Sequence, residues 1–222
     1  MAFRKTLIVT NEIYHVFNRS VGQQPIFLSS KDYERAVEVL RFYQYGKLPL
    51  RFSFFNRLAK DQKETFLLDI EESLKPVVKI ICFCLMPNHI HFLLKNLTEN
   101  GITQFMGNLQ NSYARYFNIK NGRTGTLFQQ NFKAVRIETD EQLVHVSRYI
   151  HLNPVTAYLI KPEELKQYEW SSYKDYLNTN LSYLKKKVIL DFFKSPKEYV
   201  NFVLNQVDYQ RELDRIKHLI LE

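Results

Sequence analysis

Apolar residues dominate two neighbouring segments near the middle of the chain. VVKIICFCLM (77–86) and HIHFLLK (89–95) have the length of strands, and Pro87 and Asn88 between them are typical turn residues. This pattern predicts an antiparallel β-hairpin. An earlier segment, EIYHVFNRS (12–20), has the composition of a first strand that ends in a polar turn.

Apolar residues at helical spacing indicate helices on either side of the hairpin. Ser29 or Ser30 is expected to cap a helix that runs to about Tyr45. Residues 101–119 predict a second helix, which the Asn-Gly pair at 121–122 ends.

A third helix is predicted after a further strand or hairpin at 125–137. Thr139 followed by Gln142 matches a capping box, so a helix should begin there and run to about Leu152. Pro154 is expected to end it, because the residue before a proline is pushed out of the α region.

The order of these elements is strand, helix, insertion, strand, strand, helix, strand, helix. It predicts an α+β fold in which an antiparallel sheet carries helices on one face. The inserted arm, 47–75, mixes basic and aromatic residues, which suits either a nucleic-acid surface or an extra helical lid. We expect one domain over 1–178 and a helical C-terminal extension over 179–222.

The charge of the chain favours a polyanionic partner. The 222 residues carry a formal net charge of +8 and include 17 Phe and 14 Tyr. Basic side chains release counterions when they meet phosphates, although many soluble proteins are mildly basic. Cys82 and Cys84 are expected to be buried thiols in a reducing compartment. Without a long apolar segment, no membrane partner is expected and the predicted location is the cytoplasm.

His89 and His91 are the first candidates for chemistry. They are two residues apart on a predicted strand, so both imidazoles project from one face. Two imidazoles side by side can bind a divalent cation, and two histidines hydrogen-bonded near a core would fit equally well. A histidine-triad hydrolase is excluded because the next alternate position is Leu93.

Tyr149 is the candidate nucleophile, on the capped helix. His145, Tyr149 and Asn153 are spaced four residues apart and form one stripe. A tyrosine oxygen can attack a phosphodiester when a nearby cation neutralises the developing charge. The amide oxygen of Asn153, one turn later, could bind the same metal.

Several of these segments, in order, resemble the HUH single-tyrosine transposases. MPNHIHFLLK (86–95) resembles their metal-binding motif. GRTGTLFQQNF (122–132), YIHLNPV (149–155) and EWSSYKDY (169–176) resemble REP-associated tyrosine transposases and their insertion-sequence-200-like relatives. The resemblance covers roughly residues 10–178 and rests on the ordered set, since a lone His-x-His is a weak signal.

The resemblance implies a ferredoxin-like fold and a role for each matched residue. His89 and His91 would bind the metal, Mg or Mn, Tyr149 would be the nucleophile and Asn153 the polar ligand after it. The family cleaves single-stranded DNA, often beside a hairpin, and leaves a 5′-phosphotyrosine and a 3′-hydroxyl. The expected partner is therefore single-stranded DNA with hairpins, and monomer or homodimer stays open.

Two earlier tyrosines, Tyr113 and Tyr116, are rivals for the nucleophile. We prefer Tyr149 because Asn153 follows it at the i+4 position on a well-capped helix. Tyr113 would then be a packing residue or a DNA contact. Further DNA contacts are predicted for Arg19, Tyr113, Arg123 and Lys133. The alternatives to a transposase-like nuclease are an inactive hairpin-binding regulator of the same fold and a replication-initiator or relaxase enzyme.

Overall fold

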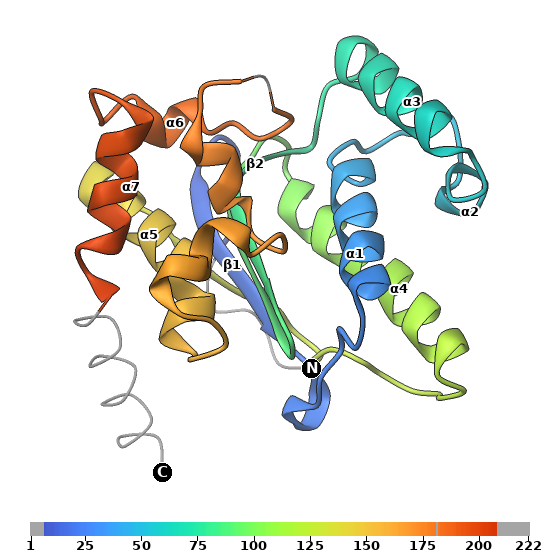
Figure 1. The fold of residues 1–222 in the computed structure, drawn as a ribbon. Helices are drawn as coiled ribbons and strands as arrows, with labels where there is room; N and C mark the ends of the chain where they lie inside the picture. The colour runs from blue at the N-terminus through green and yellow to red at the C-terminus, as the bar shows by residue number, and fades with distance from the viewer. Residues whose placement is uncertain (1–6, 181, 208–222) are drawn as a thin grey trace. The chain divides into compact units, whose positions relative to one another are not determined.

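The computed structural model of the protein describes residues 7–180 and 182–207. Its antiparallel sheet has the order β2-β3-β1-β4. The strands are β1 (Ile13–Arg19), β2 (Val78–Met86), β3 (His89–Asn96) and β4 (Lys133–Arg136). Helix α1 (Ser30–Phe42) joins β1 to β2, and α4 (Gly101–Lys120) joins β3 to β4 (Figure 1). This is the βαββαβ order of a ferredoxin-like fold, so the predicted fold class is confirmed.

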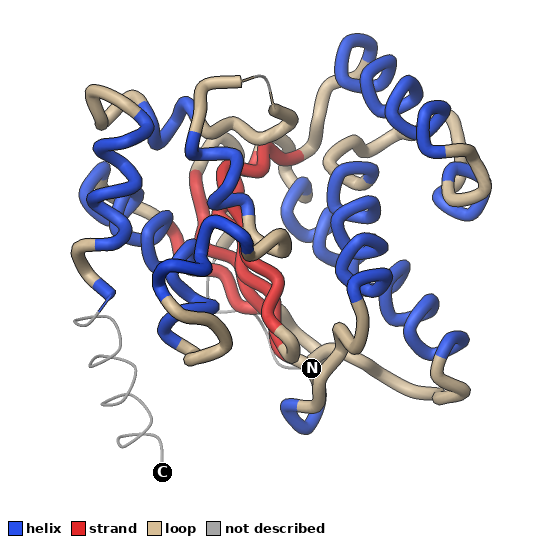
Figure 2. The backbone as a smooth tube through the Cα atoms, in the orientation of Figure 1, coloured by secondary structure: helices blue, strands red, loops and turns tan. Residues whose placement is uncertain are grey.

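Further helices lie directly after β1, in the arm and after the sheet (Figure 2). They are η1 (Val21–Gln23), α2 (Phe52–Phe55), α3 (Lys60–Ser73), α5 (Asp140–Thr156), η2 (Pro162–Gln167), η3 (Ser172–Leu177), α6 (Lys187–Leu190) and α7 (Pro196–Leu204). Within the described ranges, no helix combines the length and the apolar character that crossing a membrane requires.

The described residues form two compact units. Unit 1 contains residues 7–79, 87–89 and 94–136, and unit 2 contains residues 80–86, 90–93 and those described from 137 to 207. Helices α6 and α7 confirm helical structure after residue 178, while residues 181 and 208–222 lie outside the described part. The boundary at 178 stays a prediction.

The burial of the strands follows their sequence patterns. In β1, Tyr14, Val16 and Asn18 are buried and alternate with more exposed residues, as expected for a strand covered on one face. Nearly every residue of β2 is buried, which explains its continuous apolar run. Strand β1 pairs with β4 in a register that sets Tyr14 opposite Arg136.

Helices α1 and α4 of unit 1 meet around a buried carboxylate. Asp32 is fully buried and accepts hydrogen bonds from the Tyr116 hydroxyl at 2.9 Å and the Lys120 ammonium at 2.6 Å. Burial by itself would raise the pKa of Asp32, but bonds from Lys120, Tyr116, the Leu28 N–H and the Ser29 hydroxyl lower it below the ordinary value. The ionised carboxylate therefore ties the start of α1 to the end of α4.

The inserted arm packs on α1 through aromatic rings. Phe52 and Phe55 of α2 are buried, and their ring centroids lie 5.0 and 4.9 Å from that of Phe42. Two ion pairs, at 2.8 and 2.7 Å, also join α3 to α1: Arg41–Glu64 and Lys63–Glu38. The arm, for which the sequence left a nucleic-acid surface and a helical lid open, therefore contains two helices that pack on α1 through shared aromatic contacts.

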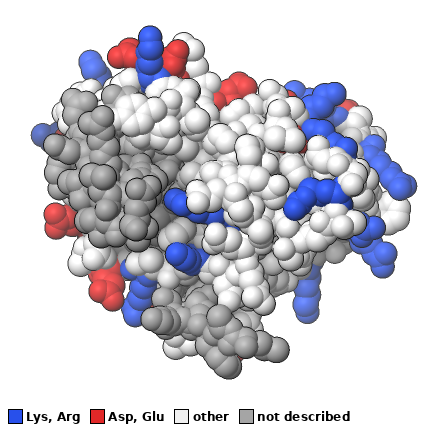
Figure 3. Space-filling model, turned by 90° about the horizontal axis from the view of Figure 1, so that it is seen from below, with Lys and Arg blue, Asp and Glu red and all other residues white. Residues whose placement is uncertain are grey.

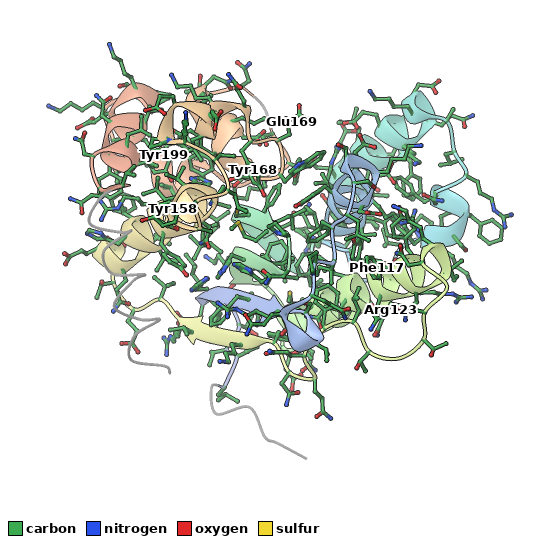
Figure 4. The ribbon with its side chains drawn as sticks, turned by 60° about the horizontal axis from the view of Figure 1, so that its bottom comes forward. Phe117, Arg123, Tyr158, Tyr168, Glu169 and Tyr199 are labelled. Carbon is green, nitrogen blue, oxygen red and sulfur yellow. The ribbon has the colours of Figure 1, made fainter. Side chains whose placement is uncertain are left out.

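Helix α5 of unit 2 is fixed by a buried histidine. The Nδ1 atom of His151 lies 2.7 Å from the Tyr199 hydroxyl of α7, and its Nε2 lies 2.9 Å from the Ser172 hydroxyl of η3 (Figure 4 labels Tyr199). Burial lowers the pKa of His151 to about 3, so the ring is neutral at physiological pH. The Tyr199 hydroxyl also lies 3.2 Å from that of Ser147. Together these contacts hold the helix that carries Tyr149.

The segment 169–176 covers the outer edge of β2. The Leu85 N–H donates to the Trp170 carbonyl at 2.8 Å, and the Phe83 N–H donates to the Ser172 hydroxyl at 2.8 Å. Uncovered strand edges invite pairing with other chains. The WSSY stretch therefore completes the sheet edge as well as holding His151.

Helix α5 continues through Pro154 to Thr156, so the predicted end at this proline is wrong. The missing N–H of Pro154 removes one hydrogen bond, to the carbonyl of Ile150, and this loss falls in the last turn of the helix. Leu152 and Val155 on that turn are fully buried. Their packing offsets the lost bond.

The start of α5 follows the capping prediction with one difference. The Gln142 N–H donates to the Thr139 hydroxyl at 3.1 Å, as expected. The Gln142 side-chain oxygen accepts from the Glu138 N–H at 2.9 Å, one residue before the position that a standard capping box uses. The predicted strand or hairpin at 125–137 is strand only in β4, and the first helix ends at Phe42 instead of Tyr45.

Candidate active site on strand β3 and helix α5

His89 begins β3 and is oriented by its neighbour Asn88. The Nδ1 atom of His89 lies 2.6 Å from the Asn88 side-chain oxygen, and the Asn88 amide nitrogen donates to the Gln23 carbonyl at 3.0 Å. Because an amide oxygen only accepts, neutral His89 carries its proton on Nδ1. Its Nε2 then bears the lone pair that could bind a metal, and such an orienting bond on the opposite nitrogen is usual for metal-binding histidines.

His91 lies against the candidate nucleophile. His91 is buried, and its ring centroid is 5.7 Å from that of Tyr149, with an interplanar angle of 88°. Tyr149 is half-buried on α5. The structure thus brings together, within unit 2, two residues that the sequence placed in one site from distant segments.

Asn153 is buried one turn after Tyr149 on α5. Its amide nitrogen donates to the Tyr149 carbonyl at 3.1 Å. This bond uses the donor end of the side chain, so the acceptor oxygen is the end that could bind a cation. The polar-ligand role of Asn153 stays a prediction.

Two imidazoles and an amide oxygen fit a divalent cation if water or phosphate oxygens complete its shell. Among the described residues, no group of three or more His, Cys, Asp and Glu side chains is placed to hold a metal. Burial raises the pKa of the thiols of Cys82 and Cys84, which are free and buried as predicted. They are therefore protonated and supply no thiolate ligand.

A buried arginine lies next to Tyr149 on α5. The Nη2 atom of Arg148 is 2.6 Å from Nδ1 of His145, and its guanidinium lies 4.2 Å from the ring centroid of Phe202. Because guanidinium only donates, Nδ1 of His145 is the acceptor. The sequence placed His145 on the Tyr149 stripe without giving it a role, and it missed Arg148 because the burial of Arg148 depends on α7.

All four predicted DNA contacts belong to unit 1, and three of them are not buried. Arg19 at the end of β1 and Lys133 at the start of β4 are exposed. Arg123 is half-buried just after α4, where it donates to the Asn118 side-chain oxygen at 3.1 Å (labelled in Figure 4). Nothing in these positions tests DNA binding, so Arg19, Arg123 and Lys133 stay predicted DNA contacts.

Tyr113 requires a correction. It is fully buried on α4, and its hydroxyl donates to the Ile26 carbonyl. Burial also raises the pKa of Tyr113, which makes it a poorer nucleophile. Of the two roles considered, packing is confirmed and DNA contact is wrong, because a ring without exposed surface cannot stack on a base.

Two supporting residues had no predicted role. Asn88 was interpreted only as a turn residue, yet it sets the tautomer of His89. His151 lies in the YIHLNPV motif, and its burial between α5, α7 and η3 depends on segments far along the chain. The role of Asn88 could have been predicted, because its side chain directly precedes His89 in the sequence and can reach its ring.

Comparison with known proteins found one matching family model and similar solved structures. The family model for IS200-like transposases matches residues 50–153. The solved structure of a REP-associated tyrosine transposase bound to a REP hairpin is 12% identical, with a TM-score of 0.54, and the match covers 80% of this chain and 86% of that one. At this identity the likeness shows the fold alone.

A second solved structure is a proposed transposase from Deinococcus radiodurans R1. It is 13% identical, with a TM-score of 0.37, and the match covers 67% of this chain and 95% of that one. This likeness is too low to support an argument. No curated protein matches the chain significantly.

The family match includes every candidate of the site. Residues 50–153 contain His89, His91 and Tyr149 and end at Asn153. The fold of the chain matches that of the hairpin-bound transposase. Over residues 50–153, slightly less than half of its length, the chain is similar to the family of IS200-like transposases.

Proposed function

We propose that this protein cleaves and rejoins single-stranded DNA by transesterification, with Tyr149 as the nucleophile. His89, His91 and Asn153 would hold a divalent metal, Mg or Mn. The observation that carries the proposal is the edge contact between the rings of His91 and Tyr149, at 5.7 Å. It sets the candidate nucleophile beside a candidate metal ligand.

In the proposed reaction, the Tyr149 oxygen attacks phosphorus in line with the leaving 3′ oxygen. The O–P bond to tyrosine forms as the P–O3′ bond breaks, which leaves a 5′-phosphotyrosine and a 3′-hydroxyl. The phenol proton passes to solvent, and the 3′ oxygen takes up a proton. One phosphodiester replaces another, so a 3′-hydroxyl can reverse the reaction and rejoin a strand.

The protein's own groups would prepare this step. A phenol is mostly protonated at neutral pH, so Tyr149 needs electrostatic help. When bound, the metal would polarise the scissile phosphate and neutralise charge on its oxygens. Asn88 orients His89, and the bond from Asn153 to the Tyr149 carbonyl orients the amide oxygen. These contacts preorganise the ligand set before DNA arrives.

The proposed substrate is single-stranded DNA that carries a hairpin. The solved relative of the same fold is bound to a REP hairpin. The net charge of +8 also favours a polyanion. We extend hairpin binding to this protein on these two grounds.

The test uses the full chain and a single-stranded hairpin oligonucleotide from the flanks of its own gene. A fluorophore at the 3′ end marks the fragment that would become attached through its 5′ phosphate. With Mn²⁺ we expect a labelled protein–DNA adduct that survives denaturation, and with EDTA no adduct. Tyr149→Phe should abolish the adduct and leave binding in EDTA unchanged. An adduct at the wild-type rate in Tyr149→Phe would overturn the proposal.

A matched control is available close to Tyr149. Tyr158 is 61% exposed, just after α5, and is labelled in Figure 4. Tyr158→Phe removes the same atom from the same kind of residue and should leave the adduct intact. Loss of the adduct in both variants would mean that the helix end, and not the Tyr149 oxygen, is being measured.

A further inference from the structure

Unit 1 contains a large groove. The residues that line it belong to other segments of the sequence than the residues of the proposed reaction. Its volume is about 990 Å³, and it is formed by α1, the segment 46–53 and α4. No Asp or Glu lines it, and neither do His89, His91, Tyr149 or Asn153. The volume is at the upper end of the range in which proteins bind small organic molecules, so a short stretch of an extended polymer fits.

Positive side chains line this groove. They are Arg35, Arg51, Arg115 and Lys120. Arg51 and Arg115 are exposed and make no ion pair with any residue in the described ranges, whereas Lys120 is paired with Asp32. In Figure 3, Lys and Arg gather on the right-hand side of the view, with few acidic groups among them. The groove therefore favours a chain of negative charges.

Flat rings and apolar side chains form the rest of the wall. The Arg35 guanidinium lies 4.3 Å from the ring centroid of Phe52 and 5.2 Å from that of Tyr116. Tyr43 is half-buried, and Ile119 is 74% exposed. Aromatic and guanidinium planes are the surfaces on which unpaired bases stack.

Polar groups that could read base edges are also present. Asn108, Asn111 and Ser112 of α4 line the groove. Amides offer both donors and acceptors, and a hydroxyl can serve as either. An acidic peptide would pair with the arginines, but its backbone and carboxylates would offer no planar bases to stack on the rings or to hydrogen-bond to the amides.

We propose that this groove binds an unpaired stretch of the DNA strand outside the cleaved phosphodiester, with phosphates on Arg51 and Arg115 and a base on Tyr43. The class of ligand rests on the proposed function. The arm at 47–75 supplies Arg51 and part of the apolar wall, so its mixture of basic and aromatic residues would serve two purposes. Its buried rings build the arm, and its exposed arginine meets the strand.

The experiment measures equilibrium binding of the full chain in EDTA, so that cleavage plays no part. The probe is a fluorescent single-stranded oligothymidine, and its partner probe has the same backbone with abasic sites in place of the bases. We expect the abasic strand to bind about tenfold more weakly, because stacking is lost while the phosphates remain. Equal binding of the two strands would overturn the proposal without any variant being needed.

Paired variants test the charges. Arg51→Gln with Arg115→Gln should weaken binding and reduce the slope of log affinity against log salt by about 0.7 for each lost single-strand contact, about 1.4 in total. Arg57→Gln with Lys60→Gln removes the same charge from exposed positions in the same arm that do not line the groove. An equal loss in both pairs would overturn the assignment, because it would reflect net charge alone.

One further pair tests the ring. Tyr43→Ala should weaken binding of oligothymidine about tenfold, while Tyr43→Phe keeps the ring and the affinity. Unfolding temperatures of each variant establish that the fold is kept. If the variants instead change the oligomeric state in sedimentation and leave DNA binding unaltered, the groove is a contact between copies of the chain and the proposal fails. Tyr149→Phe should bind both probes as the wild type does, so failure of the nuclease proposal would be seen separately.

Discussion

Helices α4 and α5 each carry a tyrosine that the sequence offers as a candidate nucleophile, and the surroundings of the two tyrosines differ. Tyr113 on α4 is fully buried, and its hydroxyl donates to the carbonyl of Ile26. Tyr149 on α5 is half-buried, and its ring meets the edge of His91. The same residue type on the same kind of element therefore serves packing in one place and lies against a candidate metal ligand in the other.

The two helices are also held by opposite kinds of buried group. The start of α1 is tied to α4 by the carboxylate of Asp32, which its hydrogen bonds keep ionised. Helix α5 is tied to α7 and η3 by His151, which burial keeps neutral. A neutral network places no additional fixed charge beside Tyr149, where negative charge would develop.

The largest expected effect is the difference in adduct formation when the hydroxyl of each of the two tyrosines is removed in turn. Tyr149→Phe should lower adduct formation by roughly 10³-fold or more, as expected when a nucleophile is removed. Tyr113→Phe should leave it within about twofold, because the Tyr113 hydroxyl serves packing and its removal changes stability first. Quenched-flow rates of adduct formation measure both, and an inactive Tyr113→Phe that still folds would reverse the comparison.

The next effect concerns the metal. His91→Gln is expected to raise the Mn²⁺ concentration for half-maximal cleavage by about 10- to 100-fold, because one imidazole ligand is lost. Asn88→Ala should give a smaller shift in the same direction, since it frees His89 to take the other tautomer. Manganese titrations of cleavage rate measure the shifts, and an unchanged titration for His91→Gln would remove it from the metal site.

The free energy of unfolding should respond in the opposite order, with the larger loss for Tyr113→Phe and the smaller for Tyr149→Phe. Tyr113→Phe leaves the Ile26 carbonyl without its donor and should lower the free energy of unfolding by about 1–3 kcal/mol. Tyr149→Phe should change it by less than about 0.5 kcal/mol. Urea unfolding followed by circular dichroism provides both values, and equal losses would show that the two tyrosines are alike in packing.

The last effect is the gradual pH dependence that His151 contributes. Its pKa is about 3 in the folded chain and about 6.5 when unfolded, so the unfolded chain binds the extra proton between these values. Stability should therefore be full above pH 6.5 and fall by about 1.4 kcal/mol for each pH unit below it. His151→Gln should lose this slope between pH 6.5 and 5. Asp32→Asn should keep it, because a lowered carboxyl pKa acts only at more acidic pH.

The sequence predicted the parts of the fold whose signals are local. The apolar runs of β2 and β3 with their Pro-Asn turn, and the Thr139 cap of α5, depend on neighbouring residues only. The end of α5 at Thr156 was not predictable, because the burial of Leu152 and Val155 offsets the proline. The arm had two open interpretations because α2 is four residues long and is held by contacts with Phe42 of α1.

The candidate site was predictable to a similar extent. Motif order identified His91 and Tyr149 before any geometry was known, and the structure sets their rings 5.7 Å apart. The burial of Tyr113 and the contacts of Arg148 were not predictable, because both depend on helices distant in the sequence. Spacing along one helix cannot reveal what packs on its opposite face.

The central claim is that the Tyr149 oxygen becomes bonded to DNA. The most direct measurement is mass spectrometry of the manganese-dependent adduct after nuclease and trypsin digestion. Trypsin cuts after Arg148, so the modified peptide should begin at Tyr149, and fragmentation should place the nucleotide on that residue and not on Tyr158. A nucleotide found on Tyr113, Tyr116 or any residue other than Tyr149 would contradict the account.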